Sequence, residues 1–137
     1  MSYLSFRDPS RRVYLAAPYS SDSASVRGWR AGAAGKVAME LILRGHLVYS
    51  PISHGHALAL QAGCSAPADF AFWRAHCLSF VRLWAELLAV LQLRGWEESA
   101  GVKAEIAEAR RLGLPVVMLE FDTYGNWHEL VEPGVKS

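Results

Sequence analysis

The chain is poor in cysteine: it has two among 137 residues, Cys64 and Cys77, and no CxxC pair. Two cysteines cannot make the disulfide framework of small secreted domains, so a reducing compartment is expected. A long apolar run is also lacking, since charged residues interrupt the apolar stretches well short of a membrane-spanning length. The first residues, MSYLSFRDPSRR, lack the apolar segment of a signal peptide. We therefore expect a cytoplasmic protein with no membrane partner.

There is no large excess of charge of either sign. The formal net charge at pH 7 is +1, which gives no electrostatic preference for polyanions and argues against nucleic acid as a partner. The chain is instead rich in apolar residues, since 52% of its residues are hydrophobic and five are tryptophan. A chain of this length buries most of the surface that its unfolded form exposes, so we expect one domain, residues 1–137, around one core.

Apolar runs rich in strand formers alternate with segments of helical periodicity. Strands are predicted at residues 11–18, 46–51, 86–93 and 114–120, and helices at residues 26–43, at 68–84 and after Gly101. Residues 52–67 lack a firm period and are predicted as an irregular loop with room for one helical turn, and a short helix is predicted around Trp127. The alternation indicates an α/β domain with a parallel sheet of four to five strands, covered by helices on both faces.

Ligands of such sheets bind beyond the carboxyl ends of the strands. This rule points to residues 17–20, which include Pro18, and to residues 50–56, 93–101 and 120–122. His54 and His56 lie in the second of these segments, where neutral imidazoles can bind a base or protonate a leaving group, or only shape the loop. Arg30, on the first predicted helix, offers a fixed positive charge for a phosphate unless it is an ordinary exposed arginine.

Glu105 occupies an unusual place on the helix that follows Gly101. With Val102 set at zero and about 100° per residue, Ile106, Ala109 and Gly113 fall within about 40° of it and form the stripe that faces the sheet. Glu105 lies only about 60° from the centre of that stripe. A partly buried carboxylate is costly unless it is paired or used. The alternative is a glutamate at the border of the buried face that reaches solvent or pairs with an arginine.

Ser99 and Gly101 open the same helix, in the segment ESAG. Free N–H groups and the helix dipole at such a point favour an anion such as phosphate, and glycine allows its close approach. Serine is also an ordinary N-cap residue, and glycine an ordinary turn residue. With Glu105, the segment places an anion anchor and a carboxylate roughly one helical turn apart.

Three segments carry a resemblance to a known family: VYLAAPYS (residues 13–20), GHLVYSPISHGHALA (45–59) and VLQLRGWEESAGVKAEIAEARRLGLPVVML (90–119). They resemble an uncharacterised bacterial and phage branch of the nucleoside 2-deoxyribosyltransferase-like superfamily. The similarity runs from about residue 12 to residue 119, and its most telling part is G-W-x-x-S-x-G-x-x-x-E followed by A-x-x-x-G-x-P-V. It implies a flavodoxin-like three-layer sandwich that assembles as a homo-oligomer, a dimer or tetramer, and binds a small nucleotide or nucleoside.

The resemblance also implies roles for individual residues. Glu105 matches the glutamate that attacks the anomeric carbon of the sugar, which is sound chemistry because a carboxylate can trap an oxocarbenium-like centre as an ester. Ser99 matches a serine that binds the 5′-phosphate in members that act on nucleotides. Tyr14 matches a tyrosine close to the nucleophile and the sugar. The resembling family also carries an arginine on the first helix, where Arg30 falls, and the resemblance includes His54 and His56.

Other readings of the same residues stay open. His54 and His56 with Cys64 and His76 would be a metal site, but their spacing is not that of known zinc sites, and no metal or cofactor is expected. Trp73 and Trp96 are candidates for stacking on a base, or belong to the core or an interface.

The sequence departs from the deoxyribosyltransferases in one important respect. Those enzymes carry aspartates ahead of the nucleophile motif, whereas here Glu86 is the one acid between Asp69 and Glu97, and Gln92 ends the third strand. A proton donor for the leaving base is therefore in doubt, and hydrolysis of a nucleoside 5′-monophosphate is preferred over transfer. Two alternatives remain: a non-catalytic nucleotide-binding module, and an oligomerising domain whose tryptophans form an interface.

Overall fold

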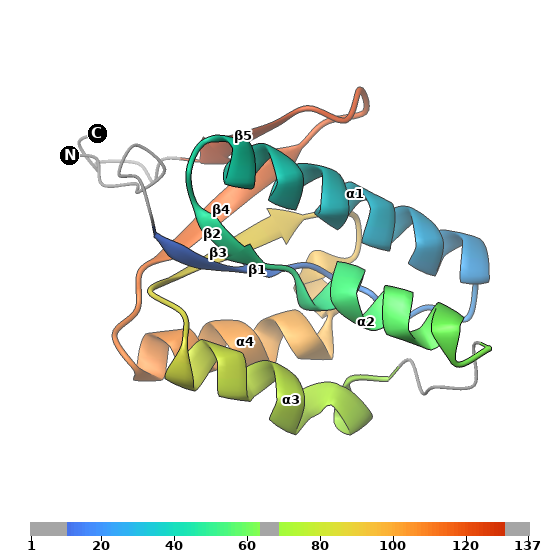
Figure 1. Ribbon diagram of the computed structural model, residues 1–137, viewed down its shortest axis with the longest axis horizontal. Coiled ribbons are helices and arrows are strands. Elements are labelled where there is room, and N and C mark those ends of the chain that lie inside the picture. Colours follow the sequence, from blue (N-terminus) through green and yellow to red (C-terminus); the bar gives the residue numbers. More distant parts are fainter. Residues whose placement is uncertain (1–10, 64–68, 131–137) are drawn as a thin grey trace.

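The computed structural model describes residues 11–63 and 69–130 (Figure 1). Strands and helices alternate along the chain, as expected, with one additional helix and one additional strand. In chain order the elements are β1 (Arg12–Ala16), α1 (Ala24–Leu43), β2 (Leu47–Tyr49), α2 (Pro51–Gln61), α3 (Phe70–Leu83), β3 (Leu87–Gln92), the 3₁₀ turn η1 (Trp96–Glu98), α4 (Ala100–Arg111), β4 (Val116–Phe121) and β5 (Trp127–Leu130).

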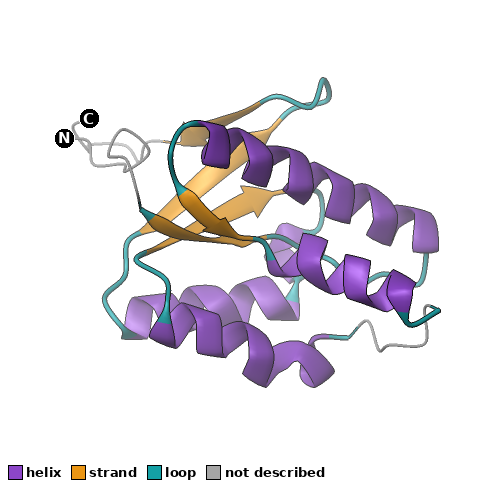
Figure 2. Ribbon diagram, in the orientation of Figure 1, coloured by secondary structure: helices purple, strands orange, loops and turns teal. Residues whose placement is uncertain are grey.

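The strands form one five-stranded sheet in the order β2-β1-β3-β4-β5. The first four are parallel, and β5 pairs antiparallel with β4 at the edge. Helices cover both faces of the sheet, with α1 and α2 on one side and α3 and α4 on the other (Figure 2). The predicted α/β, flavodoxin-like three-layer sandwich is thus confirmed.

The alternation of side chains along the central strands builds a core on each face of the sheet. Val13 and Leu15 of β1 point toward α1, where they pack with buried residues such as Val37. Tyr14 and Ala16 point the other way, toward α3 and α4. Because β1 and β3 are buried on both faces, they read in the sequence as continuous apolar runs, which is typical of central parallel strands.

The prediction of an irregular loop at residues 52–67 is wrong over its first part, where the chain forms α2. Ser50 is the N-cap, and its hydroxyl accepts a hydrogen bond from the Ser53 N–H, while Pro51 takes the first helical position. Proline is favoured there because its fixed φ suits the helix and its missing N–H needs no partner. Pro51 is the one buried residue of α2, so the helix carries no apolar stripe that a periodicity search would detect. Residues 64–67 of the predicted loop, and residue 68 of the predicted third helix, lie outside the described part.

The helix predicted around Trp127 is also wrong, because this segment is strand β5. It returns along β4 through a turn in which the Asp122 carboxylate accepts hydrogen bonds from the N–H groups of Tyr124 and Asn126. Gly125 follows with φ of 82°. An aspartate that bonds its own downstream backbone, followed by a glycine with positive φ, is a hairpin signal, and it outweighs the weak helical pattern of a few residues.

None of the helices in residues 11–63 and 69–130 is long and apolar enough to cross a membrane.

The side chain of Trp127 connects strand β5 to α1, and its contribution to the stability of the fold can be measured. The Trp127 Nε1–H donates to Glu40 Oε1 at 2.6 Å, and the Arg44 guanidinium lies 4.6 Å from the centre of the Trp127 ring. We expect Trp127→Phe, which keeps a ring but loses the donor, to lower the free energy of unfolding by about 1 to 2 kcal/mol in urea titrations. Tyr124→Phe is the control, because Tyr124 is 87% exposed. Equal midpoints for all three proteins would contradict a stabilising role.

Candidate functional site

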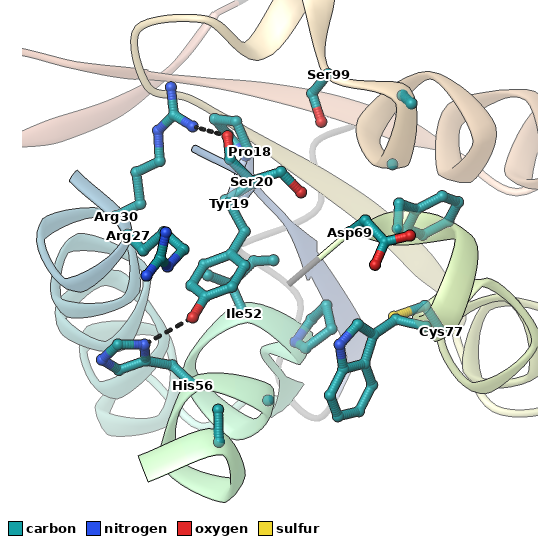
Figure 3. Close-up of a pocket in the computed structure, with 18 of the residues that line it drawn as sticks. Pro18, Tyr19, Ser20, Arg27, Arg30, Ile52, His56, Asp69, Cys77 and Ser99 are labelled. Atoms are coloured by element: carbon teal, nitrogen blue, oxygen red, sulfur yellow. Dashed lines mark hydrogen bonds between the residues drawn. The ribbon is translucent and has the colours of Figure 1, made fainter. Parts of the chain in front are cut away.

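A cavity of about 970 Å³ opens at the carboxyl-terminal edge of the sheet, where the sequence analysis expects a ligand (Figure 3). Its walls come from segments far apart in the chain: residues 17–20 after β1, the first turns of α1, one side of α2 along its length, the first half of α3, the turn after β3 and the start of α4. Figure 3 shows Arg27 and Arg30 on one side of the cavity and Asp69 and Cys77 on the other. Pro18, whose side chain is buried, lies in the wall formed after β1.

Glu105 lies in the wall of this cavity and is only 3% exposed. It is more deeply buried than Ile106, so the buried face of α4 is centred closer to Glu105 than the helical wheel suggested. Its Oε2 accepts a hydrogen bond from the hydroxyl of Tyr14, which β1 directs toward α4. The alternative of a border glutamate that reaches solvent or pairs with an arginine therefore does not describe this residue.

Burial sets the protonation of this pair. It raises the pKa of the Glu105 carboxyl to about 8, although the hydrogen bond from Tyr14 acts in the opposite direction by stabilising the carboxylate. Burial, followed by the charge of Glu105, also raises the pKa of Tyr14 well above its ordinary value. The tyrosine hydroxyl therefore stays a donor, and Glu105 is mostly protonated at pH 7 when the cavity holds no compensating charge.

The start of α4, a few residues before Glu105, forms another part of the cavity wall. Ser99 is the N-cap, and its hydroxyl oxygen accepts from the Val102 N–H at 3.2 Å. Gly101 leaves room for a ring, because a Cβ at this position would lie 3.0 Å from Cδ1 of Phe70. Ser99 and Gly101 both line the cavity, so they combine ordinary helix-start roles with a position from which an anion can be bound.

Arg30 lines the cavity but uses its guanidinium to hold two loops together. It donates to the carbonyl oxygens of Ser20 and Arg94, each at 2.9 Å, and so joins the β1–α1 loop to the turn after β3. Gly95 fits against it with φ of 91°, and a Cβ there would lie 2.8 Å from Arg30 Nη2. Arg30 still brings its charge to the site, but its first role is to fix the shape of the rim.

The two predicted histidines are separated. His56 lines the cavity, and its Nδ1 lies 2.8 Å from the hydroxyl of Tyr19. His54 is exposed and instead contacts the hydroxyl of Tyr49, which also bonds His76. The reason is that the segment is a helix, in which residues two apart point about 200° from one another.

Several residues of the site were not named as candidates in the sequence analysis, although Tyr19 and Glu98 lie in segments to which the sheet rule points. Asp69 and Glu98 both line the cavity, so it contains further carboxylates besides Glu105. Arg27, Arg74 and Tyr19 line it as well. Asp69 stands directly before α3, at its N-cap, and an aspartate ahead of a helical pattern was the signal that could have drawn attention to it.

The remaining candidates are placed as follows. Trp73 and Trp96 both pack against the core cluster that contains Tyr14, and of the two only Trp73 lines the cavity. Cys77 is buried in the cavity wall, and its thiol has a pKa raised to about 11 by burial and by Glu105. Within residues 11–63 and 69–130 no three metal-binding side chains are grouped for a metal ion, and Cys64 of the alternative metal set lies outside these residues.

The protonation of Glu105 predicts a pH-dependent stability. Its pKa is about 8 in the folded protein and near 4.5 when unfolded, so folding takes up a proton in this interval and stability falls as pH rises from about 4.5 to 8. We expect Glu105→Gln to gain stability relative to wild type over this range by a few kcal/mol, since one pKa unit corresponds to about 1.4 kcal/mol.

Urea titrations at pH 5, 6, 7 and 8 measure this difference. Glu108→Gln is the matched control on α4, where Glu108 pairs with Arg111 and with Arg82 of α3, and its difference from wild type should stay nearly constant above pH 5. A constant difference for Glu105→Gln would show that Glu105 is ionised throughout.

Comparison with known proteins adds one finding to this geometry. None of the curated proteins compared with the chain matches it. A family model with the description "Domain of unknown function (DUF1937)" matches residues 11–121, from the start of β1 to the end of β4, and this span includes the lining residues of the cavity described above. The chain therefore belongs to the DUF1937 family.

Proposed function

We propose that the protein cleaves the N-glycosidic bond of a nucleoside 5′-monophosphate, with Glu105 as the nucleophile. The observation that carries this proposal is a single buried carboxyl group, oriented by Tyr14, in the wall of a deep cavity at the ligand-binding edge of the sheet. The resemblance to the nucleoside 2-deoxyribosyltransferase-like superfamily supports the same chemistry. Transfer of the sugar to a second base is the related activity.

The geometry around Glu105 suits a double-displacement reaction. Tyr14 holds Oε2, so Oε1 is the oxygen that attacks the anomeric carbon of the sugar. The bond from this carbon to the base breaks, and a glycosyl ester of Glu105 forms. Water then attacks the anomeric carbon and releases the carboxylate, with net retention of configuration.

The other groups of the cavity are assigned by their chemistry. The 5′-phosphate binds at the start of α4, through the Ser99 hydroxyl and the N–H groups near Gly101, where the helix dipole favours an anion. Arg27 and Arg30 provide positive charge across the cavity. His56 and Asp69 are the candidates for contacts to the base, and Trp73 for stacking on it.

One observation favours a second function, a nucleotide-binding module without catalysis. Because burial raises the pKa of Glu105 to about 8, the empty site holds an uncharged carboxyl group at pH 7, and this is not a nucleophile. Binding then has to displace the proton before any chemistry begins. A homo-oligomer, as in the resembling superfamily, belongs to the same proposal, and Trp29 and Leu43 are exposed apolar residues that suit such contacts.

The first test is release of free base from a panel of ribo- and deoxyribonucleoside 5′-monophosphates, followed by chromatography. We expect wild type to release base and Glu105→Gln to be at least about 1,000-fold slower, because the attacking oxygen is lost. The kcat/KM of wild type should rise about tenfold per pH unit up to about pH 8 and then level off, since the carboxylate is the reactive form.

Tyr14→Phe tests the role of Glu105 through its hydrogen-bond partner. Its hydroxyl lowers the pKa of Glu105, so its removal should move the midpoint of the pH profile upward. Base released equally by wild type and Glu105→Gln would remove Glu105 from the mechanism. Binding of nucleotides without any release would favour the binding module.

The second test concerns the phosphate. Ser99→Gly removes the hydroxyl yet keeps an acceptable N-cap residue, so the helix should lose only a few tenths of a kcal/mol. We expect KM for a nucleoside 5′-monophosphate to rise about tenfold or more, as for a lost hydrogen bond to a charged group, with KM for the nucleoside unchanged. A KM that rises equally for both substrates would place the phosphate elsewhere.

A further inference from the structure

Among the residues that the structure describes, no positively charged side chain pairs with the buried carboxyl group of the cavity. Within the two described segments, Glu105 is hydrogen bonded to Tyr14, and the other groups that interact with it electrostatically, Tyr49 and Cys77, carry no positive charge. Arg27 and Arg30 stand across the cavity and donate to backbone carbonyl oxygens. Arg74 of α3 lines the cavity as well, and its charge lowers the pKa of the Glu108 carboxyl instead. An ionised Glu105 would therefore be a buried negative charge without a counter-charge from the described residues.

A nucleophilic carboxylate must nevertheless be ionised when it attacks. A neutral ligand would displace water from the cavity and leave the charge on Glu105 even less compensated. A ligand that carries its own positive charge next to the anomeric carbon removes this conflict, because it stabilises the carboxylate at the moment of binding. The ligand itself then supplies the positive charge that balances Glu105.

The wall around Glu105 is suited to a cationic ring. Phe70 and Trp73 line the cavity and pack against the core cluster that contains Tyr14 and Val102, so aromatic rings lie near the carboxyl group. Phe70 lies against Gly101, one turn before Glu105 on α4. A cation over an aromatic face is attracted by the ring, and the attraction grows when water is excluded. A carboxylate and aromatic faces together favour a positively charged, flat group.

The protonation that a leaving base requires favours the same class of ligand. A neutral base leaves as an anion unless it is protonated, and the other carboxyl groups in the wall, Asp69 and Glu98, are exposed. A cationic ring needs no acid, because it takes up the electron pair of the broken bond and leaves as a neutral molecule.

We propose that the substrate is a 5′-phosphorylated N-glycoside whose leaving group is a positively charged heteroaromatic ring, of which a pyridinium is the simplest case. This inference rests on the proposed function. Glu105 Oε1 forms a bond to the anomeric carbon while the bond from this carbon to the ring nitrogen breaks, and its electron pair neutralises the ring. Water then forms the new bond to the anomeric carbon, the ester bond breaks to return the carboxylate, and the second proton of that water passes to solvent. One proton is therefore released per substrate hydrolysed.

Nicotinamide mononucleotide and its reduced form test this proposal, because they are close in size and the ring of the first alone is cationic. By calorimetry at pH 7.5 we expect wild type to bind the cationic form at least tenfold more tightly than the reduced form. Glu105→Gln should lose this preference, whereas Glu108→Gln, on the same helix but outside the cavity wall, should keep it. Wild type should also release nicotinamide and one proton per turnover in weak buffer.

The possible outcomes distinguish failure of the cationic substrate from failure of the proposed function. Equal binding of both forms, or a preference that survives in Glu105→Gln, would overturn the inference. If neutral nucleotides then lose their base in a Glu105-dependent reaction, the proposed function stands and only the cationic substrate is wrong. Release of no base from any nucleotide, cationic or neutral, would overturn both.

Discussion

The hydrogen bond between Tyr14 and Glu105 joins β1, an interior strand of the sheet, to helix α4, which begins at the ligand-binding edge. Both side chains are buried, so the bond is protected from water and the polar atoms of both depend on it. The same burial raises the pKa of Glu105 to about 8 and keeps Tyr14 protonated. One contact between residues 91 positions apart in the chain thus orients the carboxyl group, while burial of the same pair raises its pKa.

The balance of charge follows from where this contact lies. Glu105 is on the α3 and α4 side of the cavity, and Arg27 and Arg30 are on the α1 side. Had an arginine paired with this carboxylate, its positive charge would lower the pKa of Glu105. The α1 side of the cavity instead carries Arg27 and Arg30, whereas the α3 and α4 side carries Glu105 beside aromatic rings, with Arg74 of α3 acting on Glu108.

Sequence reasoning succeeded where a residue's environment is set by its own element. Apolar runs predicted the central strands, and the angle of Glu105 on its helix predicted that it leans inward. It failed where the decisive neighbours are distant. The register of β1 decides that Tyr14 faces α4, and the start of α3 brings Asp69 to the cavity, yet neither is visible along the chain. Helix α2 was missed because its mostly exposed surface has no apolar period, although Ser50 and Pro51 mark its start.

Gly95 shows how little freedom the rim of the cavity has. Its φ of 91° is unfavourable for any residue with a Cβ, and that Cβ would also meet the guanidinium of Arg30. A single alanine there would strain the backbone and push apart the two loops that Arg30 connects, without touching Glu105. The rim of the cavity can therefore lose its shape while Glu105 and Tyr14 keep their positions, so a substitution far from the carboxylate can still close or distort the cavity.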